Sequence, residues 1–159
     1  MSKNKKATPQ PNDIASIVGR IVETAPDAEK ALDAVVELLH HRVSHYSWVG
    51  IYLMDGPETL VLGPYRGKPS PHTRIPLNQG ICGAAASPKE TVIVPDVNAD
   101  PRYLACSLET KSEIVIPIMH GNRCLGEIDI DSDQPNAFGA DDQMLLEAVA
   151  AKVALLLAR

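Results

Sequence analysis

Apolar residues recur along this chain at two different spacings, and each spacing predicts a different secondary structure. Spacings of three and four predict a helix from Asn12 or Asp13 to Pro26, and further helices at residues 27–44, 81–86 and 140–157. Short β-branched runs bounded by turn residues predict strands at residues 48–54, 59–62, 91–94, 112–119 and 123–131. This order is typical of an α+β domain with a central antiparallel sheet flanked by N- and C-terminal helices.

Two predicted loops and a tail complete the organisation of the chain. Residues 63–79 are rich in glycine, proline and polar residues, and connections of this length are often functional. A second loop is expected at residues 96–107. Because residues 1–12 are polar and contain two prolines, we expect a flexible tail there and a single domain at residues 13–159.

Charge and hydropathy narrow the classes of function. The 159 residues carry 20 acidic and 15 basic side chains, a formal net charge of −5, which argues against a generic nucleic-acid binder. The chain has no apolar run long enough for a membrane span, and no apolar segment follows the N-terminal lysines as a secretory signal would require. We therefore expect a cytoplasmic protein with reduced thiols.

Alternation along residues 123–131 places charges on one face of a predicted central strand. Ile128 and Ile130 are expected on one face with Cys124 and Gly126, and Leu125, Glu127, Asp129 and Asp131 on the other. Carboxylates two residues apart lie about 7 Å from each other. An enclosed face would raise at least one carboxyl pKa or require a cation, whereas a solvated face would need neither. Glu113 on the partner strand can join this group, whose acidity suits a ligand with an ammonium group.

The three cysteines differ in their surroundings. Their spacing contains no CxxC pair, so no zinc site and no metal is expected. Cys106 lies in a loop seven residues before Glu113, where a thiolate and an enclosed acid could reduce an S=O bond, although a lone loop cysteine can equally be a bystander. Cys82 is either a thiolate favoured by a helix N-terminus or a small buried residue. Cys124 is expected in the core.

Aromatic and histidine residues add less specific signals. Trp48 and Tyr52 share a strand face, where they can wall a pocket for a thioether or an ammonium group, or simply pack in the core. His41 and His45 are four residues apart on a helix without a third metal ligand, so both are expected at the surface.

Several motifs together resemble one known family. They are Trp48 to Tyr52, LVLGPY at 60–65, GKP at 67–69, RIP at 74–76, GICG at 80–83, PDV at 95–97, Ala105-Cys106, SEIV at 112–115 and DIDS at 129–132. Over roughly residues 30–155 the chain resembles the GAF-domain family of free methionine-R-sulfoxide reductases. The resemblance implies a GAF fold with a ligand pocket under loops, and reduction of free methionine-R-sulfoxide with thioredoxin as the reductant.

The resemblance also implies roles for individual residues. Cys106 matches the catalytic cysteine and Cys82 a further cysteine; Glu113, Asp129 and Asp131 match substrate-binding carboxylates, and Trp48 and Tyr52 match aromatic pocket positions. No bound cofactor is expected, and the partners are a small-molecule substrate and a thioredoxin-like thiol reductant. A homodimer is expected through the first and last helices, because the last helix is apolar at Val149, Val153, Leu155, Leu156 and Leu157.

One departure from the family pattern leaves alternatives open. The family's resolving cysteine precedes the Arg-Ile-Pro motif, where this chain has Ser70-Pro71-His72-Thr73. Either Cys82 or an external thiol resolves the catalytic thiol, or the reductase activity has been lost. His72 could instead supply a base or ligand beside Cys106, and Glu127 adds a charge of unassigned effect. The alternatives to an enzyme are a non-catalytic module that binds an amine-bearing ligand and a thiol redox sensor using Cys82 and Cys106.

Overall fold

The computed structural model of this chain describes residues 11–86, 89–104 and 108–159. Its helices are α1 (Pro11–Thr24), α2 (Ala28–Arg42), α3 (Gly80–Ala86) and α4 (Ala140–Leu157), with a short 3₁₀ turn at Val97–Ala99. The strands are β1 (Trp48–Met54), β2 (Thr59–Arg66), β3 (Arg74–Pro76), β4 (Val92–Val94), β5 (Ser112–His120) and β6 (Arg123–Ser132). The predicted α+β class is confirmed, while residues 1–10 of the predicted tail lie outside the described residues.

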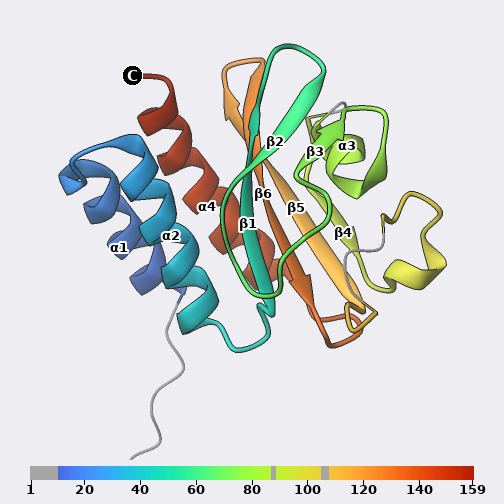
Figure 1. Cartoon of the computed structure of the whole chain (residues 1–159). Coiled ribbons are helices and arrows are strands. Elements are labelled where there is room, and N and C mark those ends of the chain that lie inside the picture. The colour runs from blue at the N-terminus through green and yellow to red at the C-terminus, as the bar shows by residue number, and fades with distance from the viewer. Residues whose placement is uncertain (1–10, 87–88, 105–107) are drawn as a thin grey trace, which may run out of the picture.

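The strands form one antiparallel sheet in the order β3-β2-β1-β6-β5-β4. The strand β6 pairs with both β1 and β5, so the predicted central strand is central. Helices α1, α2 and α4 cover one face of the sheet, and α3 lies on the other (Figure 1). The acidic side of β6 therefore faces α3 and the loops around it.

Each face of the sheet has its own apolar core. On the helical face, alternate side chains of the central strands are fully buried against α1, α2 and α4; they are Val49, Ile51, Ile114, Ile116, Ile128 and Ile130. On the other face, Trp48, Tyr52 and Val115 pack with Ile81, Cys82 and Ala85 of α3. This second core is smaller, and it encloses the carboxylates of β5 and β6.

The predicted loop at residues 63–79 contains strand structure. β2 continues to Arg66, four residues beyond the predicted end, and β3 pairs with it through Leu60 and Ile75. β3 has three residues and ends at Pro76 on the sheet edge, where a missing N–H costs no ladder bond. A strand this short leaves no alternation to detect, so the pattern alone could not predict it.

The faces of two β6 residues were predicted the wrong way round. Leu125 packs against the helical core and Cys124 against the core around α3. The register between β5 and β6 shifts between Ile118 and Met119. Ile118 pairs with Gly126 and Met119 pairs with Cys124, which leaves Leu125 as an extra residue without a partner on β5. A bulge of this kind reverses the alternation on one side of it. The predicted placement of Glu127, Asp129 and Asp131 is unaffected.

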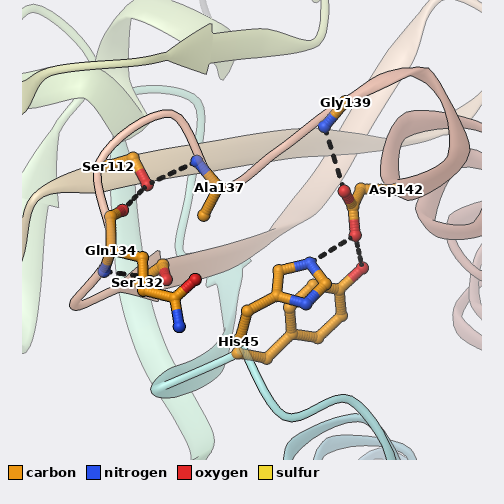
Figure 2. A network of polar contacts seen from close by, with 8 residues as sticks. His45, Ser112, Ser132, Gln134, Ala137, Gly139 and Asp142 are labelled. Atoms are coloured by element: carbon orange, nitrogen blue, oxygen red, sulfur yellow. Dashed lines mark hydrogen bonds and ion pairs between the residues drawn. The ribbon is translucent and has the colours of Figure 1, made fainter.

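Polar networks fix the segments that lead into the central strands (Figure 2). Asp142 of α4 accepts a hydrogen bond from Tyr46 and pairs with His45, each at 2.8 Å, and its second oxygen accepts from the Gly139 N–H at 3.0 Å. His45 is therefore partly buried and paired, contrary to the predicted surface position. These contacts tie the start of α4 to the residues immediately before β1.

A second network holds the segment after β6. The Ser112 hydroxyl donates to the Gln134 carbonyl at 2.6 Å and accepts from the Ala137 N–H at 3.3 Å. The Gln134 N–H in turn donates to Ser132 at 3.2 Å (Figure 2). Because Ser112 and Ser132 adjoin Glu113 and Asp131, this network fixes the end of the sheet that carries the acids.

The apolar stripe of α4 is largely used within the chain. Val149 and Val153 are fully buried in the helical core and Leu156 is nearly so, whereas Met144 and Leu155 remain exposed. The predicted homodimer through these helices stays a prediction. Among the described residues, every helix is too short or too polar to traverse a bilayer.

β6 packs so closely on β1 that residue 126 must be glycine, whereas Gly19 has free space beside it. Alanine substitutions at these two glycines should therefore have opposite effects on stability. A Cβ at residue 126 would lie 2.2 Å from the Tyr52 carbonyl oxygen, whereas at Gly19, inside α1, its nearest neighbour would be the flexible Lys152 at 3.5 Å. We expect Gly126→Ala to lower the free energy of unfolding by about 1–3 kcal/mol. Gly19→Ala should raise it by about 0.5–1 kcal/mol. Urea denaturation measures both, and equal effects would contradict the packing described here.

Candidate functional site

Four carboxyl groups from two adjacent strands lie together on the α3 side of the sheet. Glu113 pairs across the strands with Asp131, while Asp129 and Glu127 follow at alternate positions along β6. Their exposed fractions are 5% for Glu113, 4% for Asp129 and Asp131, and 0% for Glu127. Of the two possibilities left open by the sequence, a solvated face and an enclosed one, the structure has the enclosed face.

The acids have no basic partner among the described residues. None of the ion pairs formed within residues 11–86, 89–104 and 108–159 involves them. Both Glu127 oxygens, Asp129 Oδ1 and Asp131 Oδ1 are buried without a hydrogen-bond partner in that part of the chain. A buried carboxylate without a cation or donor is costly, so this cluster favours either protonated acids or a bound cation.

Burial is the main cause of the raised proton affinity of all four carboxyl groups. It is the largest cause of the raised pKa of Glu113, followed by the charges of Asp129 and Asp131. Burial likewise raises the pKa of Asp131, Asp129 and Glu127, and the charge of Asp129 adds to the effect on Asp131 and Glu127. Burial thus favours the neutral, protonated form of these acids.

Cys82 of α3 is a buried neighbour of these acids. Its Sγ donates a hydrogen bond to Asp129 Oδ2 at 3.3 Å. Burial raises the pKa of the Cys82 thiol well above its usual range, and the charges of Asp129, Glu127 and Glu113 raise it further. Of the two possibilities left open for Cys82, the structure has the small buried residue and not the thiolate, because burial and three carboxyl groups disfavour the charged form.

The two predicted aromatic residues lie on the acidic face and hold the loop above it. The Trp48 ring stacks on Tyr65 with centroids 5.7 Å apart, and its Nε1 donates to the Lys68 carbonyl at 2.9 Å. The Tyr52 hydroxyl donates to the His72 carbonyl at 2.8 Å. Both side chains thus fix the segment between β2 and β3.

Tyr65 is a site residue that the sequence reasoning missed. It was assigned to a loop, but it is a β2 residue opposite Gly50. A Cβ at Gly50 would lie 2.3 Å from the Trp48 ring, so the indole lies directly over this glycine. The signal that could have found the stack is the glycine two residues after the tryptophan.

A cavity of about 290 Å³ opens between this loop and the acids. It is lined by Ser47, Trp48, Gly67, Lys68, Pro69, Ser70, Glu109, Thr110, Asp131 and Asp133. An ion pair between Lys68 and Glu109 joins the two segments that border it. A larger hollow of about 760 Å³ beside Leu53 and Cys124 contains none of the four buried acids, so the smaller cavity is the candidate site.

Cys106 lies outside the described residues, but the chain after it borders the site. On the other side of Cys106, Leu104 packs at the start of α3, where a Cβ on Gly80 would lie 2.8 Å from its Cδ1. Glu109 and Thr110 line the cavity. Of the predicted site residues, the structure brings together Cys82, Glu113, Asp129 and Asp131, and it places Trp48 on the cavity and Tyr52 opposite Glu127.

Because Glu127 is buried, we expect its replacement by neutral glutamine to raise the free energy of unfolding, by an amount that depends on pH. Folding raises the pKa of Glu127 above its unfolded value of about 4.3. Between the unfolded and the folded pKa, the folded chain binds more protons than the unfolded chain. Stability therefore falls as the pH rises between these two values. Glu127→Gln should therefore stabilise the protein at pH 7 by at most about 3.7 kcal/mol, which is about 1.4 kcal/mol for each pH unit between about 4.3 and 7. The gain should vanish as pH falls below about 4.

Thermal and urea unfolding at several pH values measure this gain, and Glu23→Gln, at an exposed position of α1, is the matched control that should show none. A Glu127→Gln protein that is no more stable than wild type at pH 7 would contradict the buried, unpaired state of this carboxyl.

The comparisons with known proteins agree with this architecture. The model of the GAF domain family matches residues 27–157. The chain is 47% identical over 107 residues to the free methionine-R-sulfoxide reductase of Saccharomyces cerevisiae, covering 65% of this chain and 59% of the yeast protein. It is 36% identical over 121 residues to that of Escherichia coli, covering 76% of this chain and 72% of the relative. The match thus spans less than two thirds of the yeast protein.

Solved structures include both an enzyme and a protein described as a sensor. The free methionine-R-sulfoxide reductase of Neisseria meningitidis, in complex with its substrate, has a TM-score of 0.88 and 32% identity, covering 99% of this chain and 93% of that one. A putative GAF sensor protein from Burkholderia vietnamiensis has a TM-score of 0.86 and 33% identity, covering 92% of each chain. By family model, sequence and fold, this chain belongs to the GAF domain family, and free methionine-R-sulfoxide reductases are among its relatives.

Proposed function

We propose that this protein reduces free methionine-R-sulfoxide to methionine. The observation that carries the proposal is the cluster of buried carboxyl groups without a basic partner in the described chain, beside a cavity that Trp48 and Asp131 line. A free amino acid supplies the missing cation as its ammonium group. Relatives named free methionine-R-sulfoxide reductases support the choice of substrate.

The acids would serve the substrate in two ways. Asp131 lines the cavity, and Glu113 and Asp129 lie beside Asp131. An ammonium group bound in the cavity would therefore exchange its water molecules for carboxylate oxygens. Its positive charge would lower the pKa of the carboxyls it contacts and release protons from the cluster. The Trp48 ring would shelter the methyl-sulfur end, since aromatic faces bind methyl-thioether groups well.

The reaction would use Cys106 as the nucleophile. Its thiolate would attack the sulfoxide sulfur while a neutral carboxyl of the cluster protonates the oxygen. The attack forms a bond between the Cys106 sulfur and the substrate sulfur, which then carries the protonated oxygen as a hydroxyl group. As this hydroxyl group passes to the Cys106 sulfur, the S–O and S–S bonds of the substrate sulfur break. Methionine leaves with its sulfur reduced by two electrons, and Cys106 becomes a sulfenic acid carrying the oxygen. Glu109, three residues after Cys106, lines the cavity, which supports this role.

A second thiol must restore Cys106. Attack of a thiol on the sulfenic acid forms a disulfide and releases water, and a dithiol reductant then regenerates both thiols. His72 occupies the stretch where the family has its resolving cysteine, so we propose Cys82 or an external thiol for this step. A thioredoxin-like protein is the proposed reductant, with no bound cofactor.

A second candidate function is a non-catalytic module that binds an amine-bearing ligand. The buried neutral thiol of Cys82 favours it, because such a thiol is a poor nucleophile. Calorimetric titration with methionine and its sulfoxides, beside a turnover assay, separates the two. Binding without turnover supports the module and excludes the reductase.

The reductase proposal predicts which cysteine is essential. Purified protein with dithiothreitol should consume free methionine-R-sulfoxide, and Cys106→Ser should remove all activity because it lacks the nucleophile. Cys124→Ser is the matched control, since this half-buried thiol lines a different hollow, and it should keep wild-type activity. Chromatographic detection of methionine measures turnover. Undiminished turnover by Cys106→Ser would refute the assigned nucleophile.

Recognition of the ammonium predicts a selective defect in an acid variant. Asp131→Asn removes one charged partner, worth about 1.5–3 kcal/mol, and should lower kcat/KM roughly 10- to 100-fold. The N-acetylated sulfoxide, which has no ammonium group, should be a poor substrate of wild type. Asp141→Asn, a change at an exposed position of α4, is the control. Equal use of free and acetylated substrate would exclude ammonium recognition.

A further inference from the structure

Glu127 has no part in the reaction proposed above, yet its environment is the least favourable of the four acids. Its side chain is fully buried, and neither carboxyl oxygen has a hydrogen-bond partner within the described residues. It lies on β6 two residues from Asp129, opposite Tyr52 of β1, and next to the Cys82 thiol, with which it interacts. Asp129 Oδ1 is likewise buried without a partner among the described residues, and its second oxygen accepts from the same thiol. Buried polar atoms in this state point to a ligand that completes them.

The atoms around Glu127 have the spacing of a metal site. Cys82 Sγ, one oxygen of Glu113 and one oxygen of Asp129 all lie within 4.8 Å of one another. The Sγ–Oδ2 separation between Cys82 and Asp129 is 3.3 Å. In a tetrahedral zinc site, with Zn–S near 2.3 Å and Zn–O near 2.1 Å, neighbouring sulfur and oxygen ligands are about 3.6 Å apart. Small side-chain rotations would therefore bring these atoms around one ion.

The ligands come from regular elements that pack on one another. Glu113 lies on β5 and Asp129 on its neighbour β6, and Cys82 lies on α3, which packs on both strands. The charge of a divalent cation also suits these residues. Burial disfavours their ionised forms, and a divalent cation offsets two of the negative charges that they carry when ionised. Each ligand that binds as an anion gives up its proton, so metal binding would release protons.

We propose that Cys82, Glu113 and Asp129 bind one divalent cation of the zinc class. A thiolate with two carboxylates favours borderline metals such as Zn²⁺ and Co²⁺ over Mg²⁺ and Ca²⁺, which take oxygen ligands. Cysteine spacing could not predict this site, since only one of its ligands is a cysteine and the others come from two strands. Where the proposed function also holds, the cation and the substrate ammonium exclude each other, because they share Glu113 and Asp129.

Cobalt binding to the full chain tests the site through the sulfur ligand. In a Cys106→Ser/Cys124→Ser background, Cys82 is the remaining cysteine, so a thiolate-to-cobalt charge-transfer band reports on it alone. We expect one equivalent of Co²⁺ to produce this band, and one equivalent of Zn²⁺ to abolish it. Surface histidines and carboxylates give no such band. Absence of the band, or its persistence after replacement of Cys82 by serine, would overturn the proposal.

Carboxylate variants keep the test decisive if the serine variant fails to fold. Asp129→Asn in the same background should weaken Co²⁺ binding at least tenfold, while Asp141→Asn, at an exposed position of α4, should leave it unchanged, with thermal unfolding as the check on folding. Equal binding by both asparagine variants would exclude Asp129 as a ligand. The cobalt assay needs no turnover, which is measured separately on the wild-type chain. If the background binds Co²⁺ and the wild-type chain reduces no sulfoxide, the reductase proposal alone fails; if the wild-type chain is active and the background shows no band, the metal site alone fails.

Discussion

The structure depends on one electrostatic constraint, the burial of four carboxyl groups on a central sheet without a basic partner in the described chain. Glu113, Glu127, Asp129 and Asp131 are each at most 5% exposed. Burial raises the pKa of every one of them, so the cluster favours bound protons or a cation over bare carboxylates. This preference for positive charge underlies both the ammonium-bearing substrate and the cation site proposed above.

The fold makes this burial possible because the two faces of the sheet differ, one carrying the main apolar core and the other carrying the acids. Isoleucines and valines at alternate positions of β1, β5 and β6 build the large core with α1, α2 and α4. That core provides the stability, and the opposite face can then carry groups that cost stability. Most of this division could be predicted from the sequence, since alternation separates Ile128 and Ile130 from Asp129 and Asp131. The short strand β3 and the bulge at Leu125 could not be predicted, because each depends on pairing with another strand.

The candidate site was predictable in its members but less so in its chemistry. The resemblance to a known family and the alternation of β6 indicated Glu113, Asp129 and Asp131 together. Cys82 was placed correctly at the start of α3, yet the direction of its pKa shift depends on three carboxyls brought in from other elements. Tyr65 escaped notice because its role arises from a stack over Gly50. Sequence patterns report periodicity within an element, and these features arise between elements.

The central claim is that this cluster carries neutral carboxylic acid at neutral pH and gives it up to a cation. Infrared difference spectroscopy of the carboxyl C=O stretch measures it most directly, because protonated and ionised carboxyl groups absorb separately. The account predicts a protonated-carboxyl band at pH 7 in the free protein that weakens when free methionine is added. A spectrum at pH 7 with ionised carboxylates alone, unchanged by methionine, would contradict it.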